Sequence, residues 1–142
     1  MKKIFLAMTT VAILFAVSSG KSVQANPARD AIVAGFTAQA KAENPAFAGF
    51  SAEKGGAFFK ARQAGGKPET PSCTTCHGDT PFATGQTRAG KIIEPMAASK
   101  SPTRYTDPKK VAKWFFRNCR SVLGRECTAQ EKGDYLAFMI SQ

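Results

Sequence analysis

The sequence predicts an all-α fold, a small helical domain with long connecting loops. Several segments begin with a helix-capping residue and continue with apolar side chains at helical spacing. No segment shows the alternation that is typical of a β-strand. The third observation is a group of two cysteines and one histidine, Cys73-Thr74-Thr75-Cys76-His77, in the middle of the chain. These features predict helices arranged around whatever this group holds.

The spacing of this group is that of a covalent haem attachment site. Cys73 and Cys76 lie three positions apart, so one helical turn puts both sulfurs where they can bond the two vinyl groups of a porphyrin. His77 then lies under the iron as an axial ligand. A zinc site would need a fourth ligand and usually a second close cysteine pair, and a redox dithiol would need alternating strands and helices around it. We therefore predict one covalent haem c.

The N-terminal residues have the pattern of an export signal. Lys2 and Lys3 precede the apolar residues 4–17, and a small-residue cleavage site ends at Ala25. The apolar stretch is shorter than the ~20 residues that a membrane-spanning helix needs. We predict a signal peptide at residues 1–25 and cleavage after Ala25. The mature protein, residues 26–142, would be a single mono-haem cytochrome c domain in the periplasm, with no stable membrane insertion.

The sequence is strongly basic, with a formal net charge of +10 at pH 7. Much of this charge lies between Lys100 and Arg125, where the only acidic residue before Arg125 is Asp107. An exported chain meets little nucleic acid, so we expect no nucleic-acid partner. The stretch is a docking face for an acidic partner, a cradle for the haem propionates, or a solvated surface. Its basic residues are Lys100, Arg104, Lys109, Lys110, Lys113, Arg117, Arg120 and Arg125.

A first helix is expected at residues 26–44. Asn26 is a suitable cap, Pro27 lies in the first turn, and Pro45 ends the segment. Apolar side chains between them recur at helical spacing and form one stripe. The stripe consists of Ile32, Val33, Phe36 and Ala40.

A second helix is expected from its cap, Ser51, to about Ala64. The pair Gly55-Gly56 inside it is unfavourable, by about 1 kcal/mol for each glycine. Such glycines indicate that another helix crosses closely there. We expect the last helix of the chain to cross at this point and to place an aromatic side chain against the glycines. The inward residues of the second helix would be Phe58 and Phe59.

The residues between His77 and Asp107 are rich in proline and glycine and predict an irregular loop. A loop of this length in a small domain is usually wrapped around something. Here it would be the edge of the haem. The apolar side chains that would cover it are Phe82, Ile92, Ile93 and Met96.

Asp107, followed by a proline, predicts the start of the next helix. Val111, Trp114 and Phe115 follow at helical spacing, and the aromatic pair is a further candidate for the haem pocket. Asn118 continues their stripe. A polar side chain at this place is either a hydrogen-bonded core residue or helix end, or a group pointed at the iron.

Cys119 and Cys127 close a short loop, which in an oxidising compartment predicts a disulfide. The bridge would lie beside Asn118 and restrain it. A last helix is expected from Thr128, which begins a capping box, to about Ile140. Its inner face would consist of Tyr135, Leu136, Met139 and Ile140.

The sixth ligand of the iron decides between electron transfer and gas binding. His77 is the only histidine, so a second imidazole from the same chain is excluded. Met139 lies on a core stripe, whereas Met96 follows a proline on a loop, a fair position for a thioether ligand. From chemistry and spacing alone, Met96 ranks first, a vacant or weakly held site second, and Asn118 third.

Longer stretches of the sequence change this ranking of the candidates for the sixth ligand. Residues 73–82, residues 85–96, Arg117-Asn118-Cys119 and residues 123–127 resemble the sphaeroides haem protein family, which are oxygen-binding relatives of class I cytochromes c. The resemblance covers Ser51 to Gln142. It implies a class I cytochrome c-like domain, and the helix before Pro45, which matches the family least, is then an extra N-terminal helix. It also implies that Asn118 ligates ferric iron and leaves on reduction, and that five-coordinate ferrous haem then binds O2, NO or CO.

The resemblance further implies that a dihaem cytochrome c and a membrane cytochrome b supply electrons. The function expected is therefore redox-gated gas binding with electrons from a partner cytochrome. The first alternative is an ordinary electron-transfer cytochrome with Met96 on the iron. The second is a terminal reductase of oxygen, peroxide or nitrogen oxides. The chain has no second histidine as a distal acid or base, so we expect a gas-binding or electron-transfer protein rather than an enzyme.

Overall fold

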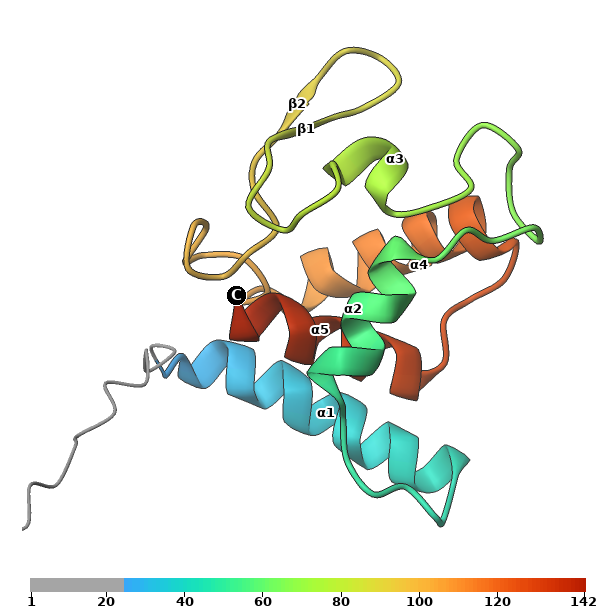
Figure 1. Cartoon of the computed structure of the whole chain (residues 1–142). Coiled ribbons are helices and arrows are strands. Elements are labelled where there is room, and N and C mark those ends of the chain that lie inside the picture. Colours follow the sequence, from blue (N-terminus) through green and yellow to red (C-terminus); the bar gives the residue numbers. More distant parts are fainter. Residues whose placement is uncertain (1–24) are drawn as a thin grey trace, which may run out of the picture.

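The computed structural model describes residues 25–142, so the predicted signal peptide lies outside the described residues except for Ala25. Figure 1 shows the helices gathered below a long loop that carries a small hairpin. The predicted all-α class is confirmed. In chain order the elements are α1 (Pro27–Glu43), α2 (Ala52–Lys60), α3 (Thr74–His77), β1 (Gly85–Gln86), β2 (Ile92–Ile93), α4 (Pro108–Leu123) and α5 (Ala129–Ser141). None of the helices within residues 25–142 is long and apolar enough to cross a membrane.

The predicted helix starts are confirmed by the capping bonds. The side chains of Asn26, Ser51 and Asp107 each accept a hydrogen bond from a backbone N–H in the first turn of their helix. Thr128 and Glu131 form the predicted capping box of α5. These bonds satisfy N–H groups that a helix leaves unpaired at its start.

The second helix is shorter than predicted, because it ends at Lys60 and not near Ala64. Ala61 leaves the helical conformation, with φ −62° and ψ 138°. The N–H of Gln63 then donates to the carbonyl oxygen of Pro71, at 2.7 Å, instead of continuing the helix. Residues 61–72 consequently form a loop that leads into the cysteine–histidine group.

The loop after His77 contains a short antiparallel ladder in which Gly85 pairs with Ile93 and Gln86 with Ile92. The expectation of no strands was wrong here. A ladder of two residues is too short for the alternation of apolar and polar side chains to show in the sequence. Gly90 in the connecting turn has φ +79°, a conformation that glycine adopts without strain.

The predicted crossing of α2 and α5 is confirmed at the glycine pair. A Cβ atom on Gly55 would collide with the carbonyl oxygen of Asp134, and a Cβ atom on Gly56 would lie 3.2 Å from the Phe138 ring. Phe138 is therefore the aromatic side chain expected against the glycines. Only the absence of side chains on α2 lets α5 lie this close.

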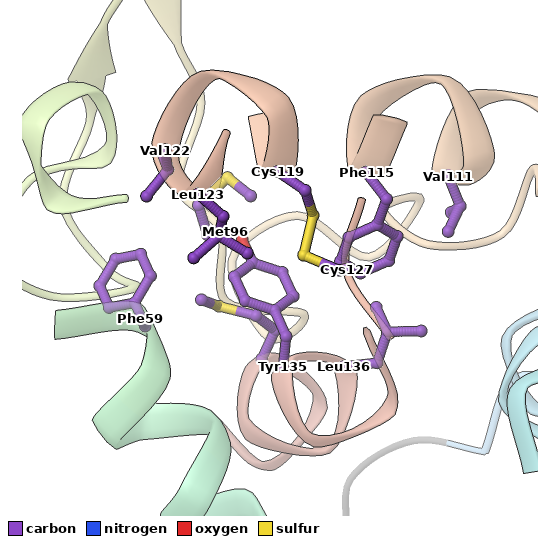
Figure 2. Close-up of a cluster of buried hydrophobic side chains, with 11 residues drawn as sticks. Phe59, Met96, Val111, Phe115, Cys119, Val122, Leu123, Cys127, Tyr135 and Leu136 are labelled. Atoms are coloured by element: carbon purple, nitrogen blue, oxygen red, sulfur yellow. A yellow bond between two sulfur atoms is a disulfide. The ribbon is translucent and has the colours of Figure 1, made fainter. Parts of the chain in front are cut away.

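The core lies between α2, α4, α5 and the loop around Met96 (Figure 2). The Phe115 ring is central, since it meets the Tyr135 ring at 5.6 Å and the Phe36 ring of α1 at 5.8 Å, both edge to face. Met139 is fully buried, so its predicted packing role is confirmed. The buried cluster consists of Phe59, Met96, Val111, Phe115, Cys119, Val122, Leu123, Cys127, Tyr135, Leu136 and Met139.

The glycine crossing gives a stability prediction with a matched control. Gly55→Ala should lower the free energy of unfolding by about 1–3 kcal/mol, because its methyl group forces α2 and α5 apart. Gly35→Ala in α1 has nothing within 4 Å of the new atom, and it should raise that free energy by about 0.5–1 kcal/mol. Urea unfolding of the haem-loaded protein measures both. Equal effects would show that the crossing is not close.

Candidate haem site

The helical turn α3 presents the cysteine–histidine group. Cys73 and Cys76 are both free, in contrast to the bonded pair farther along the chain. Ser72 fixes the start of the turn, because its hydroxyl oxygen accepts from the N–H of Thr74 at 3.3 Å and donates to the carbonyl oxygen of Phe59 at 3.4 Å. The turn is thereby tied to α2, and both thiols remain available for covalent attachment.

The imidazole of His77 is neutral at neutral pH. Burial, with a smaller contribution from the positive charge of Arg104, lowers the pKa of His77 to about 4. Its Nδ1 atom is buried and has no hydrogen-bond partner among residues 25–142. A neutral imidazole keeps the lone pair that a metal requires, and no side-chain partner within residues 25–142 competes for it. His77 therefore fits an axial ligand of haem iron.

The alternatives of a zinc site and a redox dithiol have no support in this region. No group of three His, Cys, Asp or Glu side chains within residues 25–142 is placed to hold a metal ion. Burial raises the pKa of Cys73 to about 11, so its thiol stays protonated at neutral pH. A redox dithiol or a thiolate ligand needs the opposite shift. The donor set fits a haem better than either alternative.

The described residues expose four large apolar side chains, and three of them were predicted haem contacts. Phe82 is 45% exposed, Ile92 56% and Trp114 51%, and the fourth is Phe116. These three side chains are accessible to an apolar partner such as a porphyrin. The other predicted contacts lie deeper, because Met96 and Phe115 are buried and Ile93 is partly buried against the core.

Asn118 lies beside the buried stripe of α4, not on it. That stripe runs through Val111, Phe115, Cys119 and Val122, while Trp114 and Asn118, four positions apart, share the exposed flank next to it. The side chain of Asn118 makes no hydrogen bond with any other residue between 25 and 142, and the residue is exposed. The interpretation of Asn118 as a hydrogen-bonded core residue was therefore wrong. Its amide is free to bind another group.

The loop before Cys73 fastens α3 to α4. The N–H of Lys67 donates to the carbonyl oxygen of Ser121 at 2.7 Å, and the hydroxyls of Thr70 and Ser121 lie 2.8 Å apart. Ser121 follows Asn118 by one helical turn. The loop that leads to His77 is thus bound to α4 one turn after Asn118.

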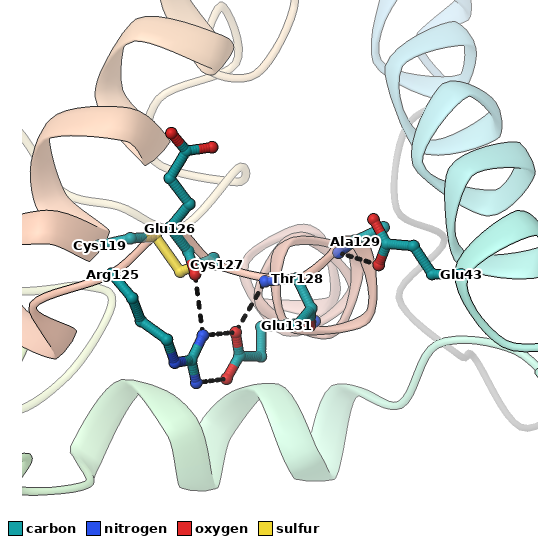
Figure 3. Close-up of polar contacts among 8 residues, drawn as sticks. All are labelled: Glu43, Cys119, Arg125, Glu126, Cys127, Thr128, Ala129 and Glu131. Carbon is teal, nitrogen blue, oxygen red and sulfur yellow. Dashed lines mark hydrogen bonds and ion pairs between the residues drawn. A yellow bond between two sulfur atoms is a disulfide. The ribbon is translucent and has the colours of Figure 1, made fainter.

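A disulfide between Cys119 and Cys127, whose Cα atoms lie 5.6 Å apart, ties the same C-terminal part of α4 to the segment before α5 (Figure 3). Arg125, in the loop that it closes, donates to both carboxylate oxygens of Glu131, at 2.7 and 2.8 Å. Glu131 also accepts from the N–H of Thr128 at 2.8 Å. The hydrogen bonds from Arg125 lower the pKa of Glu131 and keep this carboxylate charged. The connection from Asn118 to α5 is therefore short and ordered.

Sequence reasoning missed the role of two arginines. Arg29 is only 4% exposed, and its Nη2 donates to the carbonyl oxygen of Pro102 at 2.9 Å. Arg104, assigned to a basic surface, donates its Nε to the carbonyl oxygen of Pro95 at 2.7 Å. For Arg29 the available signal was its place in the first turn of a helix, where the helix dipole disfavours a cation.

Several other basic residues between Lys100 and Arg125 also have internal partners. Lys110 pairs with Asp107, and Arg120 pairs with Glu126. Within this stretch, the exposed basic residues without an ion pair to any residue of the described part are Lys100, Lys109, Lys113 and Arg117.

Comparison with known proteins identifies the family. A family model described as a domain of unknown function (DUF1924) matches residues 45–139. Cytochrome c-type protein SHP from Cereibacter sphaeroides is 48% identical over 135 residues, which cover 95% of this chain and 100% of that one. This chain belongs to the SHP family of c-type cytochromes. Its cofactor is haem c, bound covalently.

Solved structures of SHP and of a more distant relative share the fold. The structure of oxidised SHP, an oxygen-binding cytochrome c, has a TM-score of 0.73 and 49% identity, covering 80% of this chain and 96% of that one. Cytochrome c'' from Methylophilus methylotrophus is 29% identical over 108 residues, 75% of each chain. Its solution structure, which concerns haem-ligand detachment, has a TM-score of 0.69 and 28% identity, covering 80% of this chain and 93% of that one. The class I-like helical fold is thus confirmed by an SHP structure.

The four cysteines give a direct test of attachment. The double substitution Cys73→Ser with Cys76→Ser should remove covalent haem, because no thioether can form. Cys119→Ser with Cys127→Ser is the matched control and should keep it. Extraction with acidified acetone, which releases only unattached haem, distinguishes the two. Covalent haem in the first variant would refute the assignment of Cys73 and Cys76.

The same control variant tests the disulfide. Its loss should lower the free energy of unfolding by about 2–3 kcal/mol, as expected for a loop of this length. Urea unfolding of wild type and variant measures the difference. An unchanged midpoint would mean that the bridge does not stabilise the folded haem protein.

Proposed function

We propose that this SHP-family cytochrome binds O2, NO or CO in a redox-gated manner. His77 is the permanent axial ligand, and Asn118 is a ligand that leaves on reduction. The haem, when bound, supplies an iron that changes between ferric and ferrous states and takes a diatomic gas in the ferrous state. The oxygen binding of SHP and the haem-ligand detachment studied in cytochrome c'' support this proposal.

The free amide of Asn118 carries the proposal. It is exposed on the flank of α4 that also bears Trp114, and it lies one turn before the residue that binds the loop of the haem-attachment turn. An amide oxygen is a hard, neutral donor, which suits a ferric ion and holds the softer ferrous ion poorly. Reduction of the iron would therefore weaken its bond to the Asn118 amide. The released amide N–H can then donate a hydrogen bond to a gas molecule.

Met96 is less suited to be the sixth ligand, although it was favoured by spacing alone. Its side chain is 6% exposed and lies in the core with Phe59, Leu123 and Tyr135 (Figure 2). Its backbone is also fixed, since the carbonyl oxygen accepts from the Tyr105 hydroxyl at 2.9 Å. Moving the thioether to the iron would open a cavity in the core. These contacts support Asn118 over the ordinary electron-transfer alternative.

The cellular setting is part of the proposal. The N-terminal pattern supports export to the periplasm with cleavage after Ala25. The unpaired cations suit an acidic face of an electron donor, here a dihaem cytochrome c or a membrane cytochrome b. Those cations are Lys100, Lys109, Lys113 and Arg117.

Substitution of Asn118 tests the ligand directly. Asn118→Ala should convert the ferric protein to a largely high-spin form, because no other side chain on this flank of α4 replaces the amide. If the amide also holds the gas, the rate of O2 release from the reduced protein should rise about tenfold. Absorption spectra and stopped-flow kinetics measure these quantities.

Two controls accompany this substitution. Asn44→Ala, at the exposed end of α1, should change neither quantity. Met96→Leu should leave the ferric spin state unchanged. A spin state that responds to Met96→Leu and not to Asn118→Ala would overturn the proposal in favour of the methionine-ligated electron carrier.

A further inference from the structure

The first helix carries a charge in an unfavourable place. Arg29 lies in the first turn of α1, where the helix dipole disfavours a cation, and it is almost completely buried. It has no ion pair with any carboxylate within residues 25–142. Its guanidinium instead donates to two backbone carbonyls, that of Pro102 at 2.9 Å and that of Arg104 at 3.2 Å. A residue that breaks a local rule in this way is kept for its tertiary contacts.

The loop that Arg29 holds leads directly into α4. Arg104 connects this loop to the preceding residues, because its own guanidinium donates to the carbonyl oxygens of Glu94 and Pro95. Tyr105 has φ +61°, a conformation that residues other than glycine adopt only when their surroundings hold them. Arg29 thus anchors a strained loop immediately before the cap of α4 at Asp107.

Two more contacts of α1 lie along the same part of the chain. The edge of Phe36 meets Phe115, three positions before Asn118, with ring centroids 5.8 Å apart. At the far end of α1, the carboxylate of Glu43 accepts from the N–H of Ala129 at 3.0 Å, just after the disulfide (Figure 3). α1 therefore touches the chain before α4, at its middle and after it.

We propose that α1 is a brace that sets the position of α4 and, through it, of Asn118, with Arg29 and Phe36 as positioning residues. This inference rests on the proposed role of Asn118. Asn118 lies one turn of α4 before Ser121, the residue that binds the loop leading to α3. A small shift of α4 relative to that loop would therefore move the amide off its binding position. The brace keeps α4 in place after the amide is released, so that the same amide can return on oxidation.

The test uses the haem-loaded protein with Arg29→Ala and Phe36→Leu. Arg62→Ala removes an exposed arginine, and Phe47→Leu breaks the Phe47–Phe50 ring pair, which does not include α4, so these are the matched controls. Hydrogen exchange of peptides from α4 should become about fivefold faster or more in the first two variants. Their ferric high-spin fraction should rise as well. Arg29→Lys should restore part of both effects, because an ammonium group can still donate to the carbonyls.

The outcomes separate the brace from the role of Asn118. Suppose that Arg29→Ala and Phe36→Leu show the same hydrogen exchange in α4 and the same ferric spin state as their controls, while Asn118→Ala changes the spin state. The brace is then overturned and the proposed function stands. Faster exchange in α4 without any change of spin state overturns the brace as well, because α1 would then not act on Asn118. Phe36→Leu keeps an apolar side chain and provides a folded variant if Arg29→Ala does not fold.

Discussion

The fastening of α4 to the haem-attachment turn is the constraint on which the rest of the structure depends. The hydrogen bonds from Lys67 and Thr70 to Ser121 fix one end of α4 to the loop before Cys73. The disulfide at Cys119 fixes α4 to the start of α5. An axial ligand that leaves and returns needs a helix that does not drift while it is detached. These bonds supply that property independently of the ligand itself.

The two proposed iron ligands have different surroundings: His77 is held rigidly, and the side chain of Asn118 is free. His77 lies in a half-buried environment that keeps its imidazole neutral, and its turn is tied to α2 by Ser72. The side chain of Asn118 lies on an exposed flank and makes no hydrogen bond with the described chain. Such an asymmetry suits one permanent and one exchangeable ligand. Met96 is packed among the core side chains and is not placed as an exchangeable ligand.

Sequence reasoning predicted the helices, their caps and the glycine crossing, because each depends on local chemistry at fixed spacing. It failed where a contact depends on residues far apart in the chain. The end of α2 is set by a bond from Gln63 to Pro71, and the burial of Arg29 is set by carbonyls more than seventy residues away. The ladder around Gly85 was too short to leave a pattern. Placement of Asn118 on the exposed flank instead of the buried stripe also required the packing of α4 around Phe115.

The most direct measurement of the central claim is the absorption spectrum of the wild-type protein in both oxidation states, extended into the near infrared. We predict a ferric spectrum without a methionine-to-iron band, a five-coordinate ferrous spectrum after addition of dithionite, and rapid uptake of carbon monoxide. A methionine band in the ferric protein, together with a ferrous form that stays six-coordinate and does not bind carbon monoxide, would contradict it.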